Sequence, residues 1–500
     1  MDEWTSIIVP GVWVWVWAIL HVLGFVFVAI HCLRYRRQAT SAILWMFLAW
    51  SFPVIGPFLF LSFGINRVQV KGWEKEEANQ RLLKERRARE SHPKMLACWC
   101  RAHETFASKP ETQSLRDLNT TMDRLLPNSP LLSGNGVEIL VTGDEAYGPM
   151  LHAIAQAANH IHLQTFILGN DTVGREFLNL LSEKARSGVV VRLLYDGFGS
   201  NYARMSGLLS RYRGVPGMQI AGWSQVNPLK RQFQLNLRNH RKLLVVDGRE
   251  AFTGGINLHE ENVSRPGHPA IRDYHFALKG PIVQELQYSF LKDWYFMTGE
   301  RPDVLLCEEH FREVPAQGTS MVRIVNAGPT AEVEALTDIL CAALGAARKE
   351  ILAVTPYFVP TQDILRAFRL AALRGVDVRL VVPKKNNHRF VGLAAHALYD
   401  DLLTDGVRIY HRPPPFLHAK ALVVDDDLAI VGSANIDARS LRLNYETNLA
   451  VYDEAFVRML KKTVLEDVST SEEIVLSNWR TRSKLVQTAE NFCSLLSPVL

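Results

Sequence analysis

The chain has 500 residues, of which 48% are hydrophobic and 21% are charged. It is too long for a single hydrophobic core, so we expect two or more domains. The net charge of +5 is only mildly basic and does not by itself indicate nucleic-acid binding; it would suit an anionic membrane surface equally well. The six cysteines are scattered, and Cys98 and Cys100 are spaced too closely for a CxxC motif, so we interpret all six as free thiols.

Two long apolar stretches occupy residues 1–66. Residues 7–33 are almost uninterrupted apolar and have the length of a membrane span. The chain starts with Asp2 and Glu3, whereas a signal peptide has a basic start and a shorter apolar core, so we favour a retained anchor. A second span is predicted at residues 42–65, where prolines are expected to kink the helix. The prediction is a two-helix transmembrane hairpin; the alternative is a buried hairpin of a soluble protein.

Residues 67–130 form a charged segment of helical character. The run KEEANQRLLKERRARE is typical of a solvated helix face, and beside a membrane span it would also meet anionic head groups. We therefore interpret this segment as a linker. The orientation of the hairpin is left open, because Arg34, Arg36 and Arg37 favour a cytoplasmic loop while the basic residues after position 66 favour the opposite arrangement.

An α/β repeat begins after residue 130. VEILVTG, HIHLQTFILG and VVVRLLYDGFGS are predicted strands separated by helical segments, and SMVRIVNAG, EILAVTPYFVP and VDVRLVVP repeat the same order. Strands that alternate with helices of this length predict α/β units on a mainly parallel sheet. We therefore predict an internally duplicated protein whose α/β halves have mainly parallel mixed sheets, with a first half at residues 131–305 and a second half at residues 306–500.

Each half carries one copy of a motif, HRKLLVVDGREAFTGGIN at residues 240–257 and HAKALVVDDDLAIVGSAN at residues 418–435. A histidine is followed by a lysine, an aspartate, a pair of small residues and an asparagine at the same spacing in both copies. Each copy is predicted to be a strand pair with a turn at the aspartate, which directs the histidine and the lysine to one face. The matching residues are His240, Lys242, Asp247 and Asn257 in the first copy, and His418, Lys420, Asp425 and Asn435 in the second.

These side chains suit phosphodiester chemistry. Neutral imidazole is a nucleophile and a proton carrier near pH 7. Ammonium groups neutralise phosphate oxygens as charge builds up, small residues let the backbone approach a phosphate, and asparagine donates a hydrogen bond without adding charge. A single histidine on a strand is more often structural, but two complete copies in one chain favour catalysis. A pseudo-twofold between the halves would bring the two sets together.

The repeat resembles the paired HKD motif of the phospholipase D superfamily, and the chain as a whole resembles bacterial cardiolipin synthases. The second resemblance is carried by the two-span start, QTFILGNDTVG, TPYFVP, RNHRKLLVVDG, FLHAKALVVDD and the terminal LLSPVL. It implies a duplicated phospholipase D-like fold with one active site between the halves, in a multi-pass protein of the bacterial inner membrane. It also implies phosphatidylglycerol and other anionic phospholipids as partners, with no nucleic acid, no cofactor and no metal ion.

By the same resemblance, His240 is the nucleophile that forms a phosphatidyl-histidine, and His418 protonates the leaving alcohol and then deprotonates the incoming one. The two copies are near-symmetric, so the sequence alone leaves this assignment open. By the same resemblance Asp247 and Asp425 belong to the catalytic set of the motif, although their place in turns indicates that they cap turn amides.

The resemblance also implies a set of supporting residues around the histidines and the phosphate, namely Asp273, Glu446, Arg238, Asn239, Asn257 and Asn435. Asp273 and Glu446 hold the position of an acid that bonds a catalytic histidine, fixes its tautomer and favours the imidazolium. His275 is either a further contact or a packed residue.

The acceptor alcohol distinguishes the activities open to such a site. With a second phosphatidylglycerol the enzyme is a cardiolipin synthase that releases glycerol, and with water it is a hydrolytic phospholipase D; other phosphatidyltransferases are a further alternative. A nuclease is disfavoured by the predicted hairpin and by the lack of a basic stripe interleaved with stacking aromatics. A non-catalytic scaffold is disfavoured because both histidines and both lysines are present. The oligomeric state is left open.

Overall fold

The computed structural model describes residues 3–35, 39–61, 67–90, 103–110, 112–223, 237–329 and 333–495. The chain divides into two compact units, Met1–Lys71 and Gly72–Leu500. Several features singled out in the sequence lie outside the described residues, namely Arg36, Arg37, Cys98, Cys100 and all but the first residue of LLSPVL. The other four cysteines, Cys32, Cys307, Cys341 and Cys493, are free thiols.

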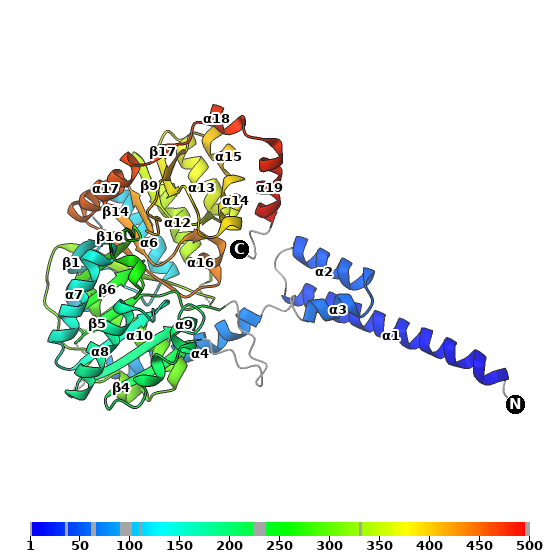
Figure 1. Cartoon of the computed structure of the whole chain (residues 1–500), viewed down its shortest axis with the longest axis horizontal. Coiled ribbons are helices and arrows are strands. Elements are labelled where there is room, and N and C mark those ends of the chain that lie inside the picture. Colours follow the sequence, from blue (N-terminus) through cyan, green and yellow to red (C-terminus); the bar gives the residue numbers. More distant parts are fainter. Residues whose placement is uncertain are drawn as a thin grey trace. The chain divides into compact units, whose positions relative to one another are not determined.

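The first unit is helical, with α1 (Glu3–Tyr35), α2 (Ala39–Ser51) and α3 (Ile55–Leu59), shown in dark blue in Figure 1. Within α1, the segment Trp13–Tyr35 is long and apolar enough to cross a membrane, and it is the only such helix in the described part of the chain. The second predicted span is broken, because α2 ends at Ser51 and Val54 has a φ of 63°. Proline has no N–H group and clashes with the preceding turn, which accounts for the break near Pro53.

The second unit is an α/β body (Figure 1), and its two halves share a core order of strands and helices, with extra short elements in the second half. The first half contains β1 (Leu132–Val141), α7 (Thr142–Gln156), β2 (His160–Thr165), α8 (Thr172–Arg186), β3 (Val190–Asp196), α9 (Asn201–Met205), β4 (Met218–Trp223), β5 (Leu243–Val246), β6 (Glu250–Gly254), β7 (Tyr274–Lys279), α10 (Ile282–Thr298) and α11 (Pro302–Leu305).

The second half contains β8 (Ser320–Ala327), α12 (Ala335–Ala346), β9 (Glu350–Val354), β10 (Phe358–Val359), α13 (Gln362–Leu373), β11 (Asp377–Pro383), α14 (Arg389–His396), α15 (Tyr399–Thr404), β12 (Arg408–Arg412), β13 (Ala421–Val424), β14 (Leu428–Gly432), β15 (Ile436–Asp437), α16 (Ala438–Arg442), β16 (Glu446–Tyr452), α17 (Glu454–Ser469), β17 (Glu472–Glu473), α18 (Leu476–Arg480) and α19 (Lys484–Leu495). The predicted boundary between the halves falls in the segment between α11 and β8.

Fifteen strands of the described residues form one continuous sheet, in the order β17-β12-β11-β9-β13-β14-β16-β8-β1-β7-β6-β5-β2-β3-β4. β1 joins the halves, because it pairs with β7 through Gly136–Val141 and with β8 through Leu132 and Asn135, with a register shift between these last two residues. β10 and β15 form a separate parallel pair. The duplicated motifs therefore lie in a shared sheet rather than in two separate ones.

The sheet is mixed, as predicted, but the prediction that most of its pairing is parallel is wrong. Parallel pairing within this sheet is limited to β2–β3–β4 and β9–β11–β12, where helices connect successive strands. The other neighbours are antiparallel. Each motif is a hairpin, whose two strands must run antiparallel, and β7 and β16 extend the two hairpins in the same sense.

Each half has its own hydrophobic core between the sheet and its helices, α7 and α8 in the first half and α12 and α13 in the second. α8 illustrates how the sequence places a helix on the sheet. Its N-terminus is capped by Asp171, whose side chain accepts a hydrogen bond from the amide of Gly174 at 2.9 Å. Residues at helical spacing then form one buried stripe, namely Val173, Phe177, Leu178, Leu181 and Ala185.

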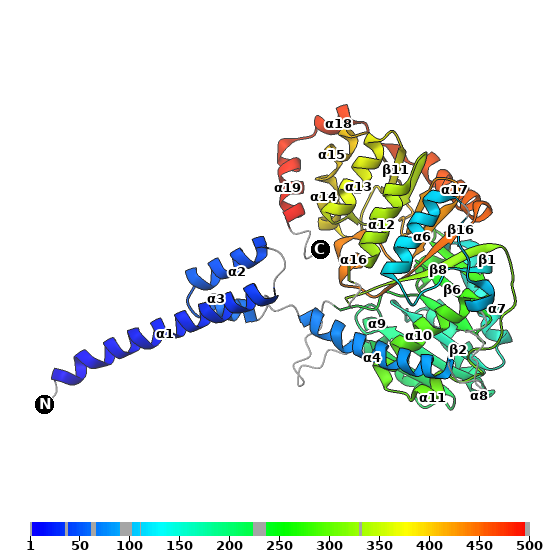
Figure 2. The ribbon, with the colours of Figure 1, turned by 180° about the vertical axis from the view of Figure 1, so that it is seen from behind.

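Residues 67–130, interpreted from the sequence as a linker, contribute two helices that pack on the second unit (Figure 2). α6 (Gln113–Leu125) joins the core of the second half through Leu118 and Met122, and it packs beside α12. From Gly72 onward, α4 (Arg67–Glu90) buries Leu82 and two basic residues. The charge pattern of α4 concealed this, because buried cations look the same in a sequence as solvated ones.

Candidate active site

The two motif hairpins are β5–β6 and β13–β14. Leu243 pairs with Thr253 in the first and Ala421 with Val431 in the second, and all four residues of β5 and of β13 are buried. His240 and His418 lie just before the first strand of each hairpin rather than on it. The apolar strands fix the hairpins in the core, so the short segments in front of them carry the histidines and lysines to a defined place.

Backbone hydrogen bonds cross between the halves at the two histidines. The amide of His240 donates to the carbonyl of Tyr445 at 2.9 Å, and the amide of Tyr445 donates to the carbonyl of Arg238 at 2.9 Å. In the same way, the amide of His418 donates to the carbonyl of Arg272 at 2.8 Å, and the amide of Arg272 donates to the carbonyl of Phe416 at 2.9 Å. This matched pairing holds the two motifs together as a pseudo-symmetric pair.

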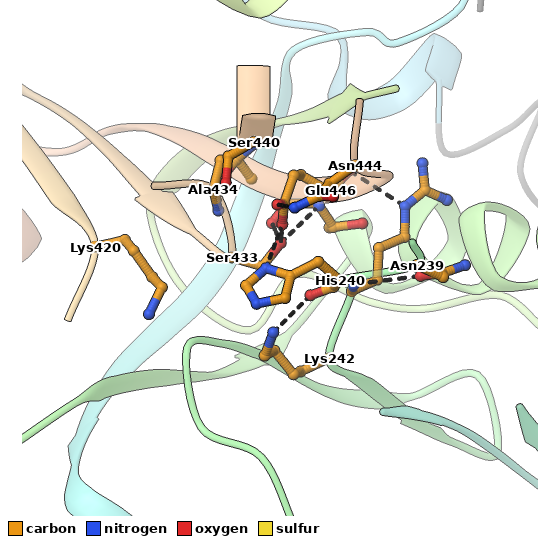
Figure 3. Close-up of polar contacts among 12 residues, drawn as sticks. Asn239, His240, Lys242, Lys420, Ser433, Ala434, Ser440, Asn444 and Glu446 are labelled. Atoms are coloured by element: carbon orange, nitrogen blue, oxygen red, sulfur yellow. Dashed lines mark hydrogen bonds and ion pairs between the residues drawn. The ribbon is translucent and has the colours of Figure 1, made fainter. Parts of the chain in front are cut away.

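His240 lies against a carboxylate of the second half (Figure 3). Its Nδ1 is 3.0 Å from Glu446 Oε2, and the Ser433 hydroxyl donates to the same oxygen at 2.6 Å. Lys242 Nζ donates to the carbonyl of His240 at 2.7 Å, and the ring of Phe166 packs edge-on against the imidazole. With Nδ1 directed to Glu446, the imidazole presents Nε2 for chemistry.

His418 lies against a carboxylate of the first half. Its Nδ1 is 2.6 Å from Asp273 Oδ2, and Asp273 is fully buried. Lys420 Nζ is 2.9 Å from the same ring nitrogen, 3.9 Å from Asp273 Oδ2, and also donates to the carbonyl of His418. Each histidine is thus oriented by an acid that the other half supplies, so neither half by itself contains a complete site.

Burial sets the charges of the site. It lowers the pKa of His240 well below the ordinary range and, together with Lys420, lowers the pKa of His418 to about 4, so both imidazoles are neutral at pH 7. Burial also lowers the pKa of Lys242 to about 7 and that of Lys420 to about 8. A phosphodiester anion between the two lysines would therefore restore their charge on binding.

The two carboxylates, Glu446 and Asp273, differ in the direction of their pKa shifts. Burial raises the pKa of Glu446 to about 7, although Lys242 opposes the shift. Burial acts in the same direction on Asp273, but Lys420 and His418 outweigh it and hold the pKa of that carboxyl below its usual value. At neutral pH, Asp273 is a full anion beside His418, while Glu446 beside His240 is close to its midpoint.

The small pair in each motif makes room for these carboxylates. Gly254 and Gly432 have φ values of 150° and 156°, and a Cβ at either position would press on the backbone of the neighbouring strand. A Cβ at Gly255 would collide with the carboxylate of Asp273, whereas the matching residue, Ser433, uses its hydroxyl to hold Glu446. Gly254 and Gly432 thus allow the neighbouring strand to pack closely, while Gly255 and Ser433 leave room for or hold the carboxylates.

Asp247 and Asp425 lie in the hairpin turns, both with positive φ, 52° and 54°. The Asp247 carboxylate accepts the amides of residues 158, 159 and 160 at 2.8–2.9 Å. The Asp425 carboxylate accepts those of residues 348, 349 and 350 at 2.7–3.2 Å. These amides occupy both carboxylates, which tie each motif turn to the start of β2 or β9.

The remaining predicted site residues are spread around the histidines. The Arg238 guanidinium stacks 3.7 Å from the centre of the Phe198 ring, and Asn257 Oδ1 accepts the amide of Ile167 at 3.1 Å. Asn435 is buried and borders Asp437. His275 is buried on β7 beside Gly254.

Sequence reasoning missed two partners of the site. The motif identifies Ser433 only as a small residue, and nothing in its spacing reveals its hydrogen bond to Glu446. Asp293 is fully buried on α10 and accepts the side-chain amide of Asn239 at 2.8 Å. Its signal was a charged residue within the apolar run YSFLKDWYFM, which predicts a buried ion pair.

No group of metal-binding side chains with the geometry of a metal site occurs among residues 3–35, 39–61, 67–90, 103–110, 112–223, 237–329 and 333–495. Positive charge at the histidines comes from Lys242 and Lys420. Two neutral imidazoles, each oriented by an acid, and two ammonium groups can together attack, protonate and stabilise a phosphodiester.

A duplicated α/β body with two such sets in one site defines the phospholipase D-like class. The family described as "Cardiolipin synthase, PLD-like domain" matches residues 150–294 and 340–468. The cardiolipin synthase of Geobacillus kaustophilus is 32% identical over 487 residues, covering 97% of this chain and 93% of that protein. The major cardiolipin synthase ClsA of Bacillus subtilis is 32% identical over 488 residues, covering 97% and 98%.

The chain therefore belongs to the cardiolipin synthase family. A solved phosphatidylserine synthase from Haemophilus influenzae superposes with a TM-score of 0.58 at 14% identity and covers 77% of this chain and 100% of its own. That likeness confirms the phospholipase D-like fold of the catalytic unit.

Proposed function

We propose that this protein is a cardiolipin synthase, which transfers a phosphatidyl group from one phosphatidylglycerol to another and releases glycerol. The observation that carries the proposal is the pair of cross-oriented histidines, His240 with Glu446 and His418 with Asp273, between two lysines. The membership of the chain in the cardiolipin synthase family supports the choice of substrate.

In the first step, His240 Nε2 attacks the phosphorus of the donor lipid, and the bond from phosphorus to the glycerol oxygen breaks. Once the bound phosphate anion has offset the two lysines, His418 is protonated; this imidazolium gives its proton to that oxygen, and glycerol leaves a phosphatidyl-histidine behind. In the second step, His418 takes the proton from a glycerol hydroxyl of the second phosphatidylglycerol, and its oxygen attacks phosphorus. The bond to nitrogen breaks, and His240 is regenerated. Lys242 and Lys420 stabilise the phosphate oxygens in both steps.

The unequal carboxylates support this division of labour. A proton carrier benefits from a full anion at Nδ1, because the anion stabilises the imidazolium that forms on proton transfer. Asp273 provides this for His418. A nucleophile must stay neutral, and His240 sits beside Glu446, whose pKa is raised to about 7. A bound phosphate anion offsets the two lysines, which favours protonation of His418.

We further propose that the first unit holds the protein in the bacterial inner membrane. α1 supplies one span, and α2 with α3 is proposed to insert beside it, because their apolar side chains are exposed, for example Ile43, Phe47 and Phe58. Single cysteines placed at either end of the α2–α3 segment and labelled from each side of intact vesicles test this. Labelling of both ends from one side contradicts a second crossing.

The test of the activity uses purified protein with phosphatidylglycerol in mixed micelles, with lipids and free glycerol measured by mass spectrometry. The expected products are cardiolipin and glycerol in equal amounts, lost in His240→Ala and retained in His152→Ala, which alters an exposed histidine of α7. Phosphatidic acid as the main product would contradict the transfer and leave a hydrolytic enzyme.

A further inference from the structure

Lys75, on the helix that follows the membrane segment, lies deep in the catalytic unit. Its side chain is 2% exposed, and its Nζ is 2.9 Å from Oδ1 of Asp293, whose side chain is fully buried. The ring of Tyr445 lies 5.0 Å from the same ammonium. One turn earlier in α4, a Cβ at Gly72 would collide with the backbone oxygen of Pro329, so glycine is needed for the helix to lie this close.

α4 is fixed along α10 by two buried ion pairs. Lys75 meets Asp293 in the second half of α10, and Arg86 meets Glu285 near its start at 2.9 Å, so the helices run antiparallel. Breaking a buried pair leaves an uncompensated charge, which is costly. The two pairs differ in their further contacts. Glu285 also contacts His103, whereas Asp293 accepts a hydrogen bond from Asn239, the residue before the catalytic histidine.

The second carboxylate oxygen of Asp293 holds both neighbours of His240. Oδ2 accepts Asn239 Nδ2 at 2.8 Å and Arg241 Nη1 at 2.9 Å, and also Gln164 Nε2 at 2.8 Å. Arg241 in turn donates from Nε to the carbonyl of Glu446 at 3.2 Å. Asp293 thereby fixes the residues on each side of the nucleophile, and Arg241 links them to the backbone of Glu446, the residue whose carboxylate orients it.

The contact of Lys75 with Oδ1 affects how many oxygens of this carboxylate Arg241 can bind. With Lys75 on Oδ1, Arg241 reaches Asp293 through one nitrogen, at Oδ2, and keeps its Nε on Glu446. Without Lys75, Oδ1 would be a buried anionic oxygen open to a second donor. Arginine and carboxylate favour a two-pronged contact, so the guanidinium would turn onto both oxygens and leave the Glu446 carbonyl. His240, next in the chain, would move with it.

We propose that Lys75 is a positioning residue for the nucleophile: by occupying one oxygen of Asp293 it keeps Arg241 on Glu446 and His240 in register with its acid. This inference rests on the proposed role of His240 as nucleophile. It makes α4 part of the active-site structure, since the helix directly after the membrane segment supplies a buried charge that the site requires.

The test compares Lys75→Met with Arg86→Met, which removes the other buried cation of the same helix. Lys75→Met is expected to lower kcat about tenfold or more with KM changed less than about twofold, because a small displacement of a reacting group is costly while binding persists. Arg86→Met is expected to lower the melting temperature at least as much as Lys75→Met does, with kcat within about twofold of the parent. Lys75→Arg is expected to restore most of kcat, since a cavity of about 100 Å³ beside Lys75 and Arg241 can admit the larger head group.

A second measurement is independent of lipid turnover. Diethyl pyrocarbonate modifies accessible neutral imidazoles, and peptide mass spectrometry gives the rate at each histidine. Lys75→Met and the milder Lys75→Gln are expected to change the rate at His240 about threefold or more and to leave the rate at His418 unchanged, because the displacement is confined to one histidine. If the parent protein makes no cardiolipin, the proposed function fails, while this readout still decides the role of Lys75.

A double-mutant comparison of Lys75 and Asp293 tests the proposal most sharply. In an Asp293→Asn background the anionic oxygen is gone, so Lys75→Met is expected to cost much less than it does in the parent. Equal losses of kcat in Lys75→Met and Arg86→Met that follow the melting temperature would overturn the proposal. So would an unchanged modification rate at His240, or effects of Lys75→Met and Asp293→Asn that simply add.

Discussion

Replacing Asp273 by asparagine removes the charge that orients His418 and leaves the shape of the side chain almost unchanged. Asp273 is fully buried, lies 2.6 Å from His418 Nδ1, and has a pKa held below its usual value by Lys420 and His418, against the effect of burial. It is therefore an anion that stabilises the imidazolium of His418, the form that protonates the leaving glycerol in the first step and that forms again in the second. The amide of asparagine keeps a hydrogen bond but cannot stabilise that imidazolium.

The magnitude follows from the lost charge interaction. Two unit charges about 4 Å apart at an effective dielectric constant of about 20 interact by about 4 kcal/mol. Each 1.36 kcal/mol is a factor of ten in rate, so we expect kcat of Asp273→Asn to fall about a thousandfold. Glu446→Gln is the matched variant. The pKa of Glu446, raised to about 7 by burial, means that it is partly neutral at pH 7, so the expected loss is smaller, about tenfold.

The assay is glycerol release from phosphatidylglycerol in mixed micelles at pH 7, with a single-turnover arm that separates the two chemical steps. Asp273→Asn is expected to slow the release of glycerol in the first turnover, where His418 acts as the acid. A Glu446→Gln variant as damaged as Asp273→Asn, or an Asp273→Asn variant that keeps more than about a tenth of kcat, would refute the asymmetric assignment of the two histidines.

Three further predictions concern the glycine, the lysines and the turn. Gly255→Ala is expected to lower kcat about a hundredfold, because its Cβ would displace the Asp273 carboxylate, and circular dichroism that shows a folded protein makes the loss interpretable. The pKa of Lys242 is lowered to about 7 and that of Lys420 to about 8, so kcat/KM is expected to fall as the pH rises through 7–8 and the ammonium groups lose protons. Lys242→Arg is expected to move this fall in kcat/KM to higher pH. A fall at unchanged pH would contradict the assignment of Lys242 as its cause. Asp247→Ala is expected to lower the free energy of unfolding by about 2 kcal/mol through three lost amide contacts, with little change in kcat of the folded protein, whereas a large loss of kcat at unchanged stability would return Asp247 to the catalytic set.

The motifs were predictable because their information is local. The spacing of histidine and lysine, the apolar run behind them and the turn at the aspartate are all contained in 18 residues, and the structure contains both hairpins. The pairing of histidines with acids was not predictable in the same way. His240 and Glu446 are 206 positions apart, and each half offers one histidine and one acid, so the sequence is equally compatible with pairing within or between halves.

Other errors arose where one residue pattern fits two environments. Alternating strands and helices favoured a parallel sheet, but the hairpins and the strands beside them made most of the sheet antiparallel. The kink expected in the second apolar stretch occurs near Val54, and its crossing of the membrane stays a prediction. Lys75 looked like one more solvated cation, because its partner Asp293 lies in the distant α10.

The most direct test of the account is to identify the covalent intermediate. Enzyme mixed with phosphatidylglycerol labelled at phosphorus is quenched within the first turnover in base, which preserves phosphohistidine, and the labelled peptide is sequenced by mass spectrometry. We expect label on His240, absent in His240→Ala and present in His152→Ala. Label on His418 would reverse the roles of the two histidines, and cardiolipin formed without any labelled histidine would contradict the two-step transfer itself.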